Sequence, residues 1–279
     1  MQLSTVLTQF SIHHDNFASP DMCSNLVVSR QVPSQKRGVH MRILTRKGDG
    51  QEPEEDPQPT HFRLVGRIGR GSFGFYVEGN RMSNGADGRD ARAVQRTAYL
   101  EHPHIAHPYA TFHWEDSIAN IGHIERGTAH GEDEIVLLML RPHQESVRLV
   151  HDLFANYHCA RDGEYDNIGY DVSGAGLGEA YNVPTWQFSN EQARTNIVTF
   201  METKKYKLTI LPAFVGDDTH PIHPNNYKAT LAGALVEVHA VMRNWRTAKE
   251  GSSASATDHQ FELVVARMKV LEGAGYEGR

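Results

Sequence analysis

Hydrophobic and polar residues alternate along several short segments of the chain, a pattern typical of half-buried β-strands. Near the beginning, the pattern predicts strands at residues 26–30 and 39–45, separated by a polar turn. The segments HFRLVGRI, starting at residue 61, and FGFYVEG, starting at residue 73, also alternate and predict strands. The apolar run at residues 135–140 predicts a strand that is buried on both faces. A mainly β protein is therefore expected.

Apolar residues recur at helical spacing in the segment 144–158. Intervals of three and four residues place them on one face of a helix, so a helix is expected there. The recurring residues are Val147, Val150, Phe154 and Tyr157. A second, shorter helix is expected at residues 190–200, with Ser189 as its N-cap.

The last third of the chain predicts three strands. The first is expected at residues 206–211, and two long strands follow at 234–245 and 260–271. The polar stretch TAKEGSSASATD connects the two long strands, which predicts an antiparallel hairpin.

Each of the two long strands is expected to have one apolar face and one mixed face, because side chains alternate along a strand. The apolar faces comprise Val236, Val238, Ala240 and Met242 on the first strand, and Val264, Ala266, Met268 and Val270 on the second. The mixed, aromatic and basic surface comprises Arg243, Trp245, Arg246, Phe261, Arg267 and Lys269. Single-stranded nucleic acid binds to such surfaces, because its bases stack on aromatic rings and its phosphates attract cations. The mixed surface is therefore a candidate binding site for a single strand. The alternative is that the rings cover the sheet against a neighbouring layer.

The segments GALVEVHAVMRNW and FELVVARMKVLE resemble the closing strands of OB-fold single-strand-binding proteins of the phage type. The resemblance covers the final third of the chain and implies an OB-like barrel there. It also implies that Arg243, Trp245, Arg246, Phe261 and Lys269 bind the strand. Residues 204–207, on the preceding predicted strand, could extend the mixed surface. The expected fold class is α+β: mainly β with a few helices, antiparallel sheets and this OB-like barrel.

Composition restricts the classes of partner. The formal net charge is −6, whereas proteins that grip duplex DNA through its phosphates usually have a strong basic excess. Two cysteines are too few for a disulfide framework. The N-terminal segment lacks the features of a secretory signal, and the longest apolar run is far shorter than the ~20 residues of a membrane helix. We therefore expect an intracellular protein, in the cytoplasm or nucleus, without a membrane partner.

A glycine-rich string resembles the glycine loop of protein kinases. Gly69, Gly71 and Gly74 form G-x-G-x-x-G, but Gln95 occupies the place of the phosphate-pairing lysine. No His-Arg-Asp or Asp-Phe-Gly sequence follows, so the residues that bind magnesium and act as the base are missing. The string predicts a glycine-rich hairpin turn, and the chain offers no complete catalytic motif.

Three histidines form a candidate metal site. His102, His104 and His107 lie within six positions, and neutral imidazole is a common metal ligand. Interleaved Pro103 and Pro108 indicate an irregular loop, in which the histidines are surface or packing residues.

Three functions remain open on the sequence. The leading hypothesis is a non-enzymatic binding module for single-stranded nucleic acid, without a cofactor. The alternatives are a metal-dependent enzyme that uses the three histidines and a structural or protein-interaction protein. The acidic, proline-rich residues 47–60 suggest regions at 1–60, 61–200 and 201–279, or a single compact body that this stretch only interrupts.

Overall fold

The computed structural model describes the greater part of the chain. The described residues are 26–32, 39–46, 61–79, 94–104, 108–128, 134–137, 140–141, 146–156, 177, 181–204, 206–248 and 257–273.

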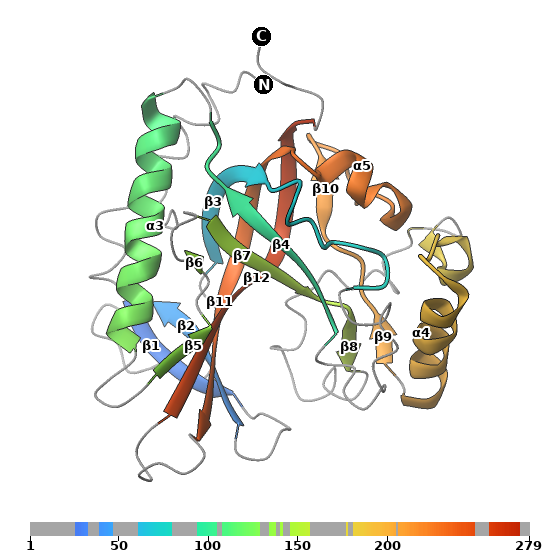
Figure 1. The fold of residues 1–279 in the computed structure, drawn as a ribbon, viewed down its shortest axis with the longest axis horizontal. Coiled ribbons are helices and arrows are strands. Elements are labelled where there is room, and N and C mark those ends of the chain that lie inside the picture. Colours follow the sequence, from blue (N-terminus) through green and yellow to red (C-terminus); the bar gives the residue numbers. More distant parts are fainter. Residues whose placement is uncertain are drawn as a thin grey trace. The chain divides into compact units, whose positions relative to one another are not determined.

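The described chain is mainly β, as the sequence predicts, with three α-helices and two short 3-10 helices among the described residues (Figure 1). The strands are β1 (Leu26–Val32), β2 (Val39–Arg46), β3 (His61–Ile68), β4 (Gln95–Glu101), β5 (Glu134–Leu137), β6 (Leu140–Arg141), β7 (Ser146–Asp152), β8 (Phe154–Asn156), β9 (Tyr206–Leu208), β10 (Ala213–Val215), β11 (Leu235–Ala248) and β12 (Thr257–Glu272). The helices are α3 (Pro108–Thr128), α4 (Glu191–Lys204), α5 (Tyr227–Leu231), η4 (Val183–Thr185) and η5 (Pro224–Asn226).

Most strands belong to one sheet, in which the pairing follows the order β1-β2-β11-β3-β4-β7-β12-β10. β11 also pairs with β12, so the pairing runs from β11 through β3, β4, β7 and β12 back to β11. β5 and β10 pair with β12 in the parallel sense, while β2 pairs with β1 and β11 in the antiparallel sense. The sheet is therefore mixed, whereas the sequence predicted antiparallel sheets.

The helix predicted at residues 144–158 is wrong, because the structure forms β7 and β8 there. Val147, Leu149 and Val150 are fully buried. Apolar residues at these positions are equally compatible with the buried face of a helix and with a strand that is buried on both faces. Pairing with the neighbouring strands decides the outcome, since β7 lies between β4 and β12. The strand predicted at FGFYVEG is also wrong, because this segment consists of turns and a single bridge to Thr97.

Helix α3 was not predicted, although its buried residues recur at helical spacing. Trp114, Ser117, Ile121 and Ile124 lie on its buried face, and Ser117 interrupts their apolar character. Pro108, which suggested an irregular loop, is the first residue of the helix, where proline is well tolerated. Helix α4 confirms the second predicted helix, but its N-cap is Asn190, whose Oδ1 accepts a hydrogen bond from Ala193 N at 2.8 Å.

The chain divides into two compact units that share its long strands. Unit 1 comprises Met1–Gly66, Glu101–Arg148 and His239–Leu263, and unit 2 comprises Arg67–Leu100, Leu149–Val238 and Val264–Arg279. No helix of the described part is long and apolar enough to cross a membrane.

Candidate functional site

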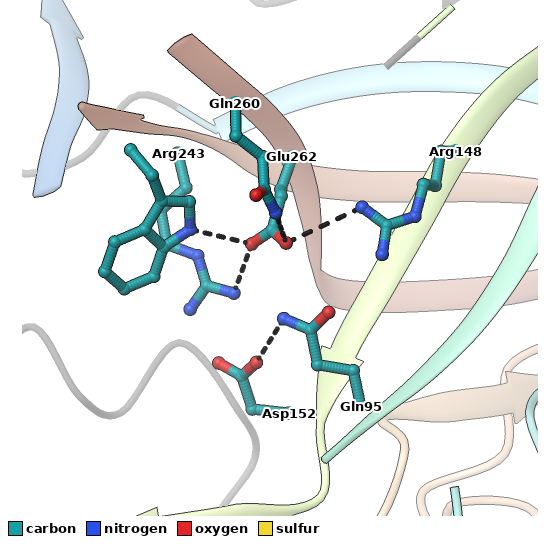
Figure 2. Close-up of polar contacts among 7 residues, drawn as sticks. Gln95, Arg148, Asp152, Arg243, Gln260 and Glu262 are labelled. Atoms are coloured by element: carbon teal, nitrogen blue, oxygen red, sulfur yellow. Dashed lines mark hydrogen bonds and ion pairs between the residues drawn. The ribbon is translucent and has the colours of Figure 1, made fainter. Parts of the chain in front are cut away.

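Two of the predicted binding residues, Arg243 and Trp245, share one carboxylate in unit 1. Arg243 Nη2 donates a hydrogen bond to Glu262 Oε2 at 2.8 Å, and Trp245 Nε1 donates one to the same oxygen at 3.0 Å (Figure 2). The guanidinium carbon of Arg243 also lies 5.3 Å from the centroid of the Trp245 ring, within cation–π range. Glu262 therefore fixes the position of both side chains.

The other oxygen of Glu262 faces two more donors. Gln260 Nε2 donates a hydrogen bond to Oε1 at 3.0 Å, and Arg148 Nη1 lies 3.6 Å from the same oxygen (Figure 2). The side chain of Glu262 is 2 % exposed, and those of Arg243 and Arg148 are 8 % and 14 % exposed. We call Arg148, Arg243, Trp245, Gln260 and Glu262 the Glu262 cluster. Within the cluster, Arg243 and Arg148 both contact the carboxylate of Glu262.

Phe261 does not share this surface, so the prediction that its ring lies on the outer face beside Trp245 is wrong. Its side chain is fully buried. Because Glu262 contacts Arg243, alternation along β12 turns Phe261 to the opposite face of the strand. Phe261 cannot stack on a base in this conformation.

The opposite face of the hairpin carries its own polar contact. Asn244 Nδ2 lies 3.1 Å from His259 Nδ1, and the rings of His259 and Phe261 stack with their centroids 6.0 Å apart. The sequence misleads at this point because both faces of β12 are apolar, with Leu263 and Val264 equally buried. The register of the two strands decides which face joins Arg243.

Arg267 and Lys269 lie in unit 2, where each contacts a neighbour. The guanidinium carbon of Arg267 lies 5.0 Å from the centroid of the Phe214 ring. Lys269 Nζ donates a hydrogen bond to Asp217 Oδ1, and this contact lowers the pKa of the Asp217 carboxyl below its usual range. Arg267 remains exposed. The side chains of Arg246 and of residues 204–207 lie outside the described part of the structure.

The candidate histidine site is described in part. His104 N donates a hydrogen bond to His102 Nδ1 at 2.9 Å, and the centroids of the two imidazole rings lie 4.7 Å apart. His104 has a φ of 49°, which fits an irregular turn. His107 lies outside the described residues, and within those that are described no three His, Cys, Asp or Glu side chains gather as metal ligands would.

The glycine-rich string forms a turn, but the strand expected after it is absent and Gly74 instead bridges to Thr97 of β4. Thr97 N donates a hydrogen bond to Gly74 O at 3.3 Å, and a Cβ atom at Gly74 would lie 2.5 Å from Thr97 O. Phe73 and Val77 are buried. Gln95, which replaces the kinase lysine, donates from Nε2 to Asp152 Oδ1 at 3.0 Å (Figure 2). Close packing of the backbone accounts for the glycine at position 74.

Arg96 is the buried cation that holds this turn, and its place on the apolar face of β4 is the only sequence signal for it. Its side chain is fully buried and donates hydrogen bonds to Tyr76 O at 3.0 Å, Val77 O at 3.1 Å and Thr209 O at 2.9 Å. It also lies over the ring of Tyr227, 5.8 Å from the centroid. Burial lowers the pKa of Arg96 to about 10, so the guanidinium stays charged at neutral pH.

Comparison with protein-family models, curated proteins and solved structures finds no match to this chain.

Proposed function

We propose that this chain is an OB-like, non-enzymatic binding module for single-stranded nucleic acid. The observation that carries the proposal is the pairing order of five strands. The five strands are β3, β4, β7, β11 and β12, numbered 1 to 5 in chain order. Their pairing order is 1-2-3-5-4-1, that is β3-β4-β7-β12-β11-β3. This order is that of the five-stranded Greek-key barrel of the OB-fold.

The strand numbers also indicate which elements of this chain would contact the nucleic acid. OB-folds bind oligonucleotides with their second and third strands and with the loops that join the first to the second strand and the fourth to the fifth. The corresponding elements here are β4, β7 and the connections 69–94 and 249–256. The Glu262 cluster draws its residues from β7, β11 and β12, and Trp245 precedes the second connection by only a few positions.

The chemistry of the Glu262 cluster suits a single strand. Trp245 is half-buried, so part of its ring is available to stack on a base, a contact worth roughly 1–3 kcal/mol. Arg243 and Arg148 bring two guanidinium groups to the carboxylate that also holds Trp245, and guanidinium groups bind phosphate well. Because the whole chain carries a net charge of −6, we expect modest affinity that depends strongly on salt.

Tryptophan fluorescence tests the proposal. The chain has three tryptophans, of which Trp114 and Trp186 are buried and Trp245 is half-buried. Titration with oligo-dT or oligo-U at low salt is expected to quench the emission, and the affinity is expected to fall as salt rises. Trp245→Phe should abolish the quenching signal, and Arg148→Ala should weaken binding.

Arg126→Ala is the matched control, because Arg126 is an exposed cation of unit 1 on α3, away from the Glu262 cluster in sequence. It removes one positive charge and should leave binding unchanged. Absence of quenching and of any mobility shift with single-stranded DNA and RNA at low salt would rule the proposal out. An equal loss of oligonucleotide affinity in the Arg148→Ala and Arg126→Ala variants would show that binding is nonspecific and does not use the Glu262 cluster.

A further inference from the structure

We propose that a pocket beside the glycine-rich turn of unit 2 binds a single nucleobase whose edge presents adjacent N–H donors, as guanine does. The pocket has a volume of about 320 Å³, at the lower end of the range for small-molecule sites. Its lining comes from the glycine-rich turn and from residues around η4, η5 and α5. Among the lining residues are Phe75, Tyr76, Glu78, Gln187, Phe188 and Lys228. This site does not depend on the strand-binding proposal.

The aromatic wall of the pocket is exposed and fixed in place. Tyr76 is 41 % exposed, and together with Val215 it makes up the large apolar side chains left exposed among the described residues. Its ring packs edge-on against Phe73 at a centroid distance of 5.6 Å, and its carbonyl is held by Arg96. An exposed ring that is already immobile can stack on a base without a large loss of side-chain freedom.

Glu78 supplies the group that selects the ligand. It lines the pocket and is only 6 % exposed, yet no hydrogen bond or ion pair from the described part of the chain reaches its carboxylate. An ionised carboxylate only accepts hydrogen bonds, so its natural partner is a pair of neighbouring N–H groups. Guanine presents N1–H and N2–H side by side, whereas adenine would turn the lone pair of N1 toward the carboxylate.

A cation at the rim suits the phosphate of a nucleotide. Lys228 is exposed and has no partner among the described residues. Lys228 is the one basic residue of the described pocket lining, and Arg96, which lies buried and interacts with Glu78, does not line it.

The far wall is tied together before any ligand arrives. Asn225 Oδ1 accepts a hydrogen bond from Gln187 N at 2.7 Å, and Asn225 Nδ2 donates one to Thr185 O at 3.0 Å. Phe188, on the same wall, stacks with buried Trp186 at a centroid distance of 6.4 Å. The side chain of Gln187 is exposed and without a partner within the described chain, so it can reach the ligand.

Calorimetric titration of the full chain with GMP, IMP, AMP and guanosine tests the proposal. GMP should bind best, IMP more weakly because it lacks the 2-amino group, and AMP weakest. Guanosine should bind more weakly than GMP to the native chain, and Lys228→Ala should remove that difference. Tyr76→Ala should lower the affinity for GMP by about 5- to 100-fold, while Tyr76→Phe should leave it unchanged.

Glu78→Gln should weaken GMP about tenfold or more and reduce the preference for GMP over AMP. Should that variant fail to fold, the preference of the native chain for GMP over AMP decides the question. No heat of binding with millimolar GMP, or equal affinity for GMP and AMP, overturns the inference. Trp245→Phe should leave GMP binding unchanged, so failure of this site and failure of the strand-binding proposal are distinguishable.

Discussion

Arg243 and Glu262 form an ion pair at 2.8 Å in which the two side chains are 8 % and 2 % exposed. The pair joins β11 to β12 and positions the Trp245 ring through the same carboxylate oxygen. A buried ion pair of this kind contributes little net stability, but removing one partner is costly because the other charge stays buried.

Glu262→Gln is therefore expected to lower the free energy of unfolding by about 3–5 kcal/mol, since two guanidinium groups lose their counter-charge. Urea denaturation followed by circular dichroism measures the change. Asp217→Asn is the control, because it breaks the exposed contact with Lys269 and should have no measurable effect. Equal effects of the two variants would contradict the assignment of a buried pair.

Arg96→Met should destabilise the chain by on the order of 3 kcal/mol, because the carbonyls of Tyr76, Val77 and Thr209 lose their donor in the interior. Arg96→Lys keeps the charge but not the planar set of donors, so an intermediate loss is expected. Thermal unfolding gives the comparison, with exposed Arg126→Met as the control. A neutral Arg96→Met variant would show that the turn does not depend on this cation.

Two glycines of the same turn should respond differently to substitution. Gly74→Ala places a Cβ atom 2.5 Å from Thr97 O and should cost about 1–3 kcal/mol of unfolding free energy. Gly71→Ala meets no atom within 4 Å and should be neutral or slightly stabilising. Denaturation midpoints of the two variants test the close packing of the turn on β4, which predicts a clear difference between them.

His113 should make the fold sensitive to mild acid. Burial lowers the pKa of His113 below 6.5, with Asp116 opposing the shift. As pH falls below 6.5 the unfolded chain takes up this proton before the folded one, so stability declines until the folded pKa is passed, at no more than ~1.4 kcal/mol per pH unit. His113→Gln should reduce this dependence in urea titrations between pH 7.5 and 5, whereas exposed His123→Gln on the same helix should not.

The strands were largely predictable, and the candidate site only in part. β1, β2, β3, β11 and β12 each follow from alternation, and Arg243 and Trp245 were recognised from it. The sequence carries no signal for Glu262, because the pairing of β11 with β12 is what brings its carboxylate to Arg243 and Trp245. Arg96 carries no further local signal, because its hydrogen bonds join segments that are distant in the chain, as its bond to Thr209 O shows. The place of Glu78 in the pocket lining likewise depends on segments that only folding brings together.

Alternation in the sequence locates β1, β2, β3, β11 and β12 and places neighbouring residues of each strand on opposite faces, because that alternation is a local property of the backbone. Pairing with distant segments, and no local pattern, makes β7 and β8 strands, turns Phe261 away from Trp245 and buries Arg96. A strand face becomes part of the interior only when another segment packs against it. Strand pairing and register are set by contacts between distant segments, and local patterns leave both undetermined.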